Sequence, residues 1–147
     1  MANESIARLL AAAFLFIAHS ALAADPRPAP RTIVGVRIQE FGKSQDEGER
    51  EIDECKAFRP TPRDIREFFL KSYPVPARLG QHDRYSPCHA TGTVEFSDNT
   101  RGKWKISSSG AGTLFWDTGD TVDLFYGDYR WKDPFACSYG SSSEGEC

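Results

Sequence analysis

The sequence predicts an α+β fold: an antiparallel β-meander of four to five strands with one helix packed on one face, stapled by disulfides. Between residues 91 and 126, apolar and polar residues alternate in short segments that are separated by Gly-, Asn- and Asp-containing turns. A single amphipathic helical pattern covers residues 61–73. The chain holds four cysteines, an even number that an exported protein is expected to pair. A helix followed by sequential strands is typical of this fold class.

Residues 32–41 are expected to form the first strand. Val34, Val36 and Ile38 recur at every second position, which predicts an apolar face packed against a core. The charged segment 42–54 follows and is the most acidic part of the chain. It is either a solvated loop or a loop that meets a basic partner.

The helix over 61–73 has clear start and stop signals. Thr61 is expected to cap it, Pro62 occupies the first helical position, and Asp64 completes a capping box. The helix should end near residue 73, because Pro74 disfavours helical backbone in the residue before it. The positions on its apolar face are Ile65, Phe68 and Phe69.

Four further strands are expected after the polar loop 77–90, with turns at 97–102, 107–112 and 117–120. Alternation assigns one set of side chains to the core face of the sheet. These inward residues are Gly92, Val94, Phe96, Trp104, Ile106, Leu114, Trp116, Val122, Leu124 and Tyr126.

The N-terminus predicts export. Residues 1–23 combine Arg8, the apolar run Leu9–Ala18 and a small-residue A-x-A site at 21–23, the layout of a signal peptide. The run is shorter than the roughly 20 residues that span a bilayer. Cleavage leaves no membrane anchor and gives a periplasmic or secreted protein. The expected organisation is then a Pro-rich linker (24–31), a single α+β domain (32–137) and a Ser/Gly-rich C-terminal tail (138–147).

Four cysteines allow three disulfide pairings, and sequence alone does not choose among them. We favour Cys55–Cys88, which ties the segment before the helix to the start of a strand. We also favour Cys137–Cys147, which closes a short loop and holds the tail. Zinc is the weaker alternative, because the spacings contain no C-x-x-C pair.

The composition argues against several function classes. The net charge is −3 and no basic patch is evident, so no nucleic-acid binding is expected. The segment 107–112 is neither a nucleophile elbow nor a P-loop. The sequence therefore predicts no catalytic residue, no cofactor and no metal ion.

The 82–89 loop contains a cysteine and two histidines, which are candidate catalytic or metal-binding residues. His82 can reach Cys88, but a disulfide at Cys88 would remove that nucleophile. His82, Asp83 and His89 form a donor set that suits zinc or iron, although their spacing matches no known motif.

The segment 124–135 is the richest in aromatic residues, interleaved with charges. Some of these rings are expected in the core. Exposed rings beside an arginine have the composition of interface hot spots, and exposed Trp or Tyr can also stack on sugars. The predicted partner-binding residues are Tyr129, Arg130, Trp131 and Asp133.

Several short stretches, 58–61, 65–69, 82–88, 102–106 and 124–126, resemble small uncharacterised exported proteins of Gram-negative bacteria. The resemblance implies a periplasmic home. Some small proteins of this general build are immunity proteins or enzyme inhibitors. The leading hypothesis is an exported, non-enzymatic binding protein that occludes a protein partner such as a toxin or lytic enzyme. The alternative is a small envelope hydrolase or a glycan- or metal-binding module that uses the 82–89 loop.

Overall fold

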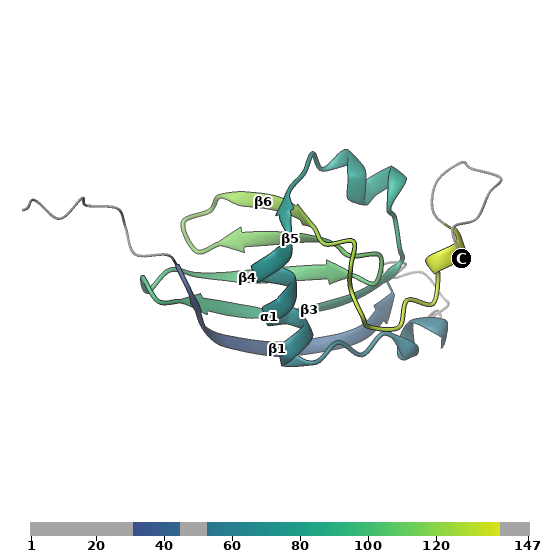
Figure 1. Ribbon diagram of the computed structural model, residues 1–147, viewed down its shortest axis with the longest axis horizontal. Coiled ribbons are helices and arrows are strands. Elements are labelled where there is room, and N and C mark those ends of the chain that lie inside the picture. Colours follow the sequence, from purple (N-terminus) through teal and green to yellow (C-terminus); the bar gives the residue numbers. More distant parts are fainter. Residues whose placement is uncertain (1–30, 45–52, 139–147) are drawn as a thin grey trace, which may run out of the picture.

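The computed structural model describes residues 31–44 and 53–138, which form one antiparallel sheet with a helix on one face (Figure 1). The predicted α+β class is confirmed, although the sheet has six strands rather than four to five, in the order β1-β3-β4-β5-β6-β2. The elements are β1 (Ile33–Ser44), α1 (Pro62–Lys71), β2 (Tyr73–Pro74), β3 (Cys88–Phe96), β4 (Arg101–Ser107), β5 (Ala111–Trp116) and β6 (Thr121–Phe125). Short helical turns are η1 (Asp53–Ala57), η2 (Leu79–Asp83) and η3 (Ala136–Ser138).

Helix α1 begins as its sequence predicts. The Thr61 hydroxyl accepts a hydrogen bond from the backbone N–H of Asp64 at 3.3 Å, and the Asp64 carboxylate accepts one from the Thr61 N–H at 2.7 Å. The helix ends at Lys71, two residues before the predicted end. Tyr73 and Pro74 instead form the short edge strand β2, which pairs with β6.

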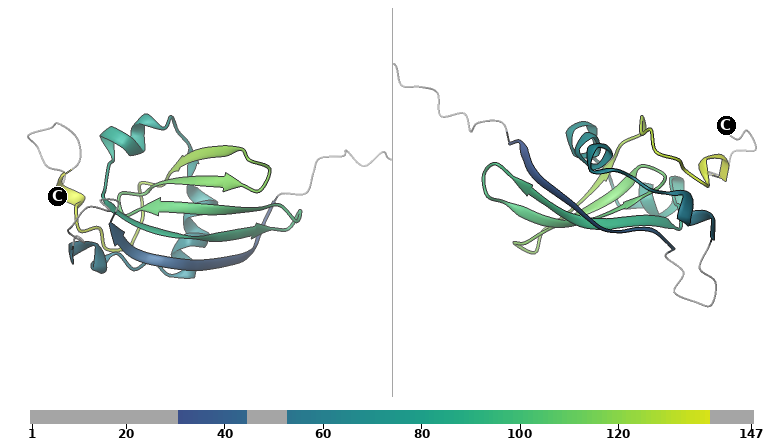
Figure 2. Two further views of the ribbon diagram at one scale, coloured as in Figure 1. Left: turned by 180° about the vertical axis from the view of Figure 1, so that it is seen from behind. Right: turned by 90° about the horizontal axis from the view of Figure 1, so that it is seen from below.

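The core lies between the sheet and α1. Every inward side chain predicted for the four later strands belongs to the core or packs against it; Gly92, which has no side chain, is the one inward position that adds none. Ile65 and Phe68 of α1 are buried against the sheet, with Phe69 partly buried beside them. Figure 2 shows that the chain after β6 runs back over the same face of the sheet as α1. The core is therefore covered by both α1 and the segment 126–138.

One strand face departs from the prediction. Val34 is 55% exposed and does not join the core, whereas Ile33 packs against it. The cause is a β-bulge: Ile33 pairs with Phe96 and Gly35 pairs with the adjacent Glu95, which leaves Val34 as the extra residue. The bulge reverses the alternation at the start of β1, so only Val36 and Ile38 of the predicted face pack on the core.

The predicted Cys55–Cys88 disulfide is present and joins η1 to the first residue of β3. The Cys137–Cys147 pairing lies outside the described residues, because Cys147 is not among them. The expected signal peptide (1–23), most of the linker and tail, and residues 45–52 of the acidic segment also lie outside them. No helix in the described ranges is long and apolar enough to cross a membrane.

Candidate functional site

Trp131, the central residue of the predicted partner-binding set, belongs to the core. Its side chain is 9% exposed, lies edge-on to Phe58 and stacks on Tyr129 with ring centroids 5.0 Å apart. The indole N–H donates to the Ser108 carbonyl at 2.8 Å. The expectation that Trp131 is an exposed anchor is wrong. The chain leaves the sheet after Phe125, so strand alternation no longer describes which side chains are exposed.

Tyr129 and Asp133 belong to a polar network that holds the same segment in place. The Asp133 carboxylate accepts hydrogen bonds from the Tyr129 hydroxyl at 2.9 Å and from the Ser108 hydroxyl at 2.7 Å. Ser108 therefore accepts from Ser86, whose hydroxyl lies 2.7 Å away. Burial, followed by the neighbouring Asp133, raises the pKa of Tyr129. Of the four predicted residues, Arg130 is exposed, Tyr129 and Asp133 are partly buried and Trp131 is buried.

The structure does not assemble the 82–89 loop into a reactive centre. Cys88 is bonded to Cys55 in a disulfide and therefore has no thiol to act as a nucleophile. His82 is exposed in η2, whereas His89 lies partly buried on β3, where burial and then Lys105 lower its pKa. Among the residues that the structure describes, no group of three His, Cys, Asp or Glu side chains is placed to hold a metal ion.

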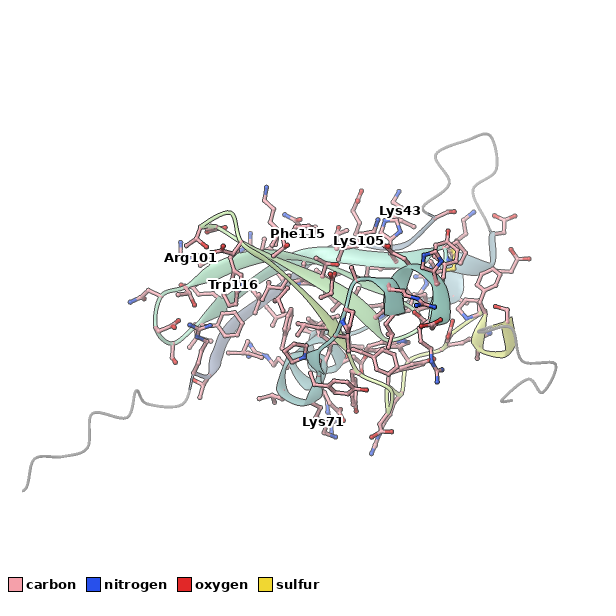
Figure 3. The ribbon with its side chains drawn as sticks, turned by 90° about the horizontal axis from the view of Figure 1, so that it is seen from above. Lys43, Lys71, Arg101, Lys105, Phe115 and Trp116 are labelled. Atoms are coloured by element: carbon pink, nitrogen blue, oxygen red, sulfur yellow. A yellow bond between two sulfur atoms is a disulfide. The ribbon has the colours of Figure 1, made fainter. Side chains whose placement is uncertain are left out.

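A different surface stands out: the sheet face that points away from α1, here called the open face. Figure 3 shows the side chains of Lys43, Lys105, Arg101 and Phe115 on one side of the sheet and Lys71 of α1 on the other. Strand pairing puts basic residues in excess on the open face. The basic residues are Arg37, Lys43, Arg101, Lys103 and Lys105, and the acidic ones are Glu40, Glu95 and Asp123.

The centre of the open face is a row of paired residues across four strands, here called the central rung: Arg37, Thr93, Lys103 and Phe115. Arg101, on the neighbouring row, is paired with Glu95 at 2.8 Å. Within the described ranges, by contrast, Arg37 and Lys103 have no hydrogen bond or ion pair. Phe115 is 42% exposed beside them.

A shallow groove of about 410 Å³ runs over this part of the sheet. Its floor and walls include Gly35, Arg37, Thr93 and Lys103. Glu95 and Asp117 also line the groove, and Glu95 is already paired with Arg101. Arg37 and Lys103 can receive an anionic group there, while Phe115, the pairing partner of Lys103 on the next strand, offers an apolar surface beside the groove. The sequence does hold a signal for this surface, since residues 101–105 alternate basic and non-basic side chains around the buried Trp104.

Comparison with known proteins found no matching family model, no matching curated protein and no matching solved structure. The structure itself defines the chain as a disulfide-bonded α+β domain with one packed and one open sheet face.

Proposed function

We propose that this protein is an exported, non-enzymatic binding protein whose open face binds a protein partner. The observation that carries the proposal is the central rung, where two cations without a partner in the described residues flank Thr93 beside an exposed phenylalanine. Arginine and aromatic side chains are enriched among the residues that dominate binding energy at protein interfaces. Arg37 and Phe115 would be the anchors of this surface.

Charge complementarity favours a partner with an acidic surface. The basic residues of the open face would attract it during encounter and hold its carboxylates once bound. The basic partner expected from the acidic segment 42–54 rests mainly on residues 45–52, which the structure does not describe. A toxin or lytic enzyme would be inhibited if this contact covered its active site.

Export is part of the same proposal. The N-terminal signal pattern and the buried Cys55–Cys88 disulfide together favour an oxidising location, either the periplasm or the exterior. Mass spectrometry of the protein recovered from a cell fraction tests this directly. We expect a mature chain that begins at Ala24 in the periplasmic or extracellular fraction; an uncut chain in the cytoplasm would contradict it.

The binding proposal is tested with a charge reversal and a matched control. Mature wild-type protein, Lys103→Glu and Arg63→Glu are immobilised and exposed to envelope extract, and captured proteins are quantified by mass spectrometry. Arg63 is exposed in the first turn of α1, on the opposite side of the sheet. A glutamate is favourable near a helix N-terminus, so the control should fold normally.

We expect one protein with an acidic surface to be retained by wild type and Arg63→Glu and lost with Lys103→Glu. With that partner purified, Lys103→Glu and Phe115→Ala should each weaken binding by roughly tenfold or more. Binding of wild type should also weaken as salt rises. A partner retained equally by all three proteins would contradict the assignment of the open face.

A further inference from the structure

A second hollow lies at one corner of the open face, separate from the central rung. The segment 75–85, which includes η2, passes over β5 and β6 and encloses a cleft of about 320 Å³. Gly80 approaches Ala111 so closely that an added Cβ would lie 3.2 Å from the alanine side chain. The volume is at the lower end of the range for small-molecule sites.

The cleft contains one side chain of each charge on a single row of the sheet. Lys105 of β4 pairs with Thr113 of β5, and Thr113 pairs with Asp123 of β6. All three residues line the cleft. Two strand spacings separate the backbones of Lys105 and Asp123, which is roughly 10 Å. Lys105 and Asp123 therefore lie on opposite sides of Thr113 and are not paired directly with each other.

The acidic end of this row is held in position. The Thr113 hydroxyl donates to Asp123 Oδ1 at 2.6 Å. Within the described part of the chain, Asp123 Oδ2 has no hydrogen-bond partner, so it can accept from a ligand. Val75 adds an apolar wall, and the main chain at Gly112 is not shielded by a side chain of its own.

We propose that this cleft binds a small zwitterion, with the ligand ammonium at Asp123 and the ligand carboxylate at Lys105. A dipeptide with free termini is a ligand of this kind, because its ends carry opposite charges and its extended length of about 7 Å lies within the separation of roughly 10 Å between the two strands. Charge-assisted hydrogen bonds at both ends would give orientation as well as affinity. The site is independent of the partner-binding proposal, which uses the central rung.

The test is a titration of the mature protein (residues 24–147) with alanyl-alanine. Binding is monitored through the amide chemical shifts in two-dimensional NMR spectra. We expect saturable shifts at Gly80, Gly112 and Thr113. N-acetylated and C-amidated alanyl-alanine each lack one charge, and each should bind roughly tenfold more weakly or worse. A neutral monosaccharide of similar size serves as the control for a polar but uncharged ligand.

Two variants test which charged group of the ligand each of the two residues binds. Asp123→Asn still accepts the Thr113 hydrogen bond and should bind free and N-acetylated dipeptide equally weakly. Lys105→Met keeps the side-chain stem and should bind free and C-amidated dipeptide equally weakly. A third variant, Ala77→Trp, places a bulky ring at an exposed position on the cleft and should block binding of every ligand without altering the core.

Three results would overturn the proposal. The first is an absence of shifts at the cleft amides at tens of millimolar dipeptide. The second is equal affinity for the free and blocked dipeptides, and the third is stronger binding of the neutral monosaccharide. In each case Lys103→Glu remains a separate test of the central rung, so failure at one site does not decide the other.

Discussion

At the scale of single residues, the aromatic segment after β6 serves the fold. Trp131 is buried in the core, and the carboxylate of Asp133 accepts hydrogen bonds from the hydroxyls of Ser108 and Tyr129. A buried polar network specifies one arrangement only when its members are satisfied. Here Ser86 continues the chain by donating to Ser108 while accepting from the Cys88 N–H at 3.2 Å. The network thereby fastens residues 129–135 to the sheet.

Trp131→Ala should consequently destabilise the protein. We expect a loss of about 3–5 kcal/mol in the free energy of unfolding, because a large buried ring is removed and Ser108 loses its indole partner. Arg130→Ala, at the exposed neighbouring position, should stay within about 0.5 kcal/mol. Urea unfolding of both variants measures this. A loss below about 1 kcal/mol for Trp131→Ala would show that the ring is not part of the core.

Ionisation of Tyr129 should make the free energy of unfolding depend on pH in the alkaline range. Burial and Asp133 raise its pKa in the folded protein above the unfolded value of about 10. The stability that this shift contributes is therefore complete below about pH 10 and is lost as the pH rises toward the higher folded pKa. Tyr129→Phe cannot ionise, so its unfolding free energy should fall less than that of wild type between about pH 9 and pH 11. Parallel curves for the two proteins would contradict this.

At the scale of elements, α1, which depends on local sequence signals, was predicted more accurately than β1, whose register depends on pairing with β3. Helix α1 follows its capping box and apolar stripe closely. Strand β1, by contrast, shows register irregularities at several points along its length, including the bulge that exposes Val34. Both edges of the sheet resist pairing with another chain: β1 through these irregularities, and β2 through its two-residue length and Pro74.

The cap of α1 makes a measurable contribution. Thr61→Ala removes the hydroxyl that accepts the Asp64 N–H and should lower the unfolding free energy by about 1 kcal/mol. Thr61→Ser retains a hydroxyl in the same place and is the matched control. Urea unfolding of the two variants gives the comparison. Equal losses for both would mean that the hydroxyl hydrogen bond is not the source of the effect.

At the scale of the whole molecule, the disulfide joins two parts that contribute to one core. Cys55 and Cys88 are both fully buried and lie 33 residues apart, with α1 between them. A cross-link of this span limits the unfolded chain and stabilises the fold by roughly 3–4 kcal/mol on the chain-entropy model. It also holds η1 at the start of β3, where Phe58 reaches Trp131.

Removing this bridge should weaken folding strongly. The double variant Cys55→Ala/Cys88→Ala is expected to lose roughly 3–4 kcal/mol of unfolding free energy relative to oxidised wild type. Urea unfolding with and without reductant separates the two expected bridges. Any further loss on reducing the double variant measures the Cys137–Cys147 pairing. A double variant as stable as wild type would contradict the importance of the Cys55–Cys88 bridge.

The four cysteines allow three pairings, which the sequence left open, and the structure confirms the Cys55–Cys88 pairing that we favoured. Sequence patterns alone were sufficient to predict the α+β class, the position and cap of α1 and the inward faces of the four later strands. These features depend on contacts close in sequence or on a period of two or 3.6 residues, which the order of side chains expresses directly. The extra strand β2 was missed, because a two-residue strand ending in proline has no periodicity.

Which polar and aromatic residues lie on the surface depends on the tertiary structure. Trp131 is interior because the chain after Phe125 folds back over the core, an event that alternation within strands cannot express. The central rung brings together Arg37, Lys103 and Phe115 from three strands, and the cleft pairs Lys105 with Asp123 through Thr113. Such neighbours are set by strand register and bulges, which depend on pairing across the sheet rather than on any one segment.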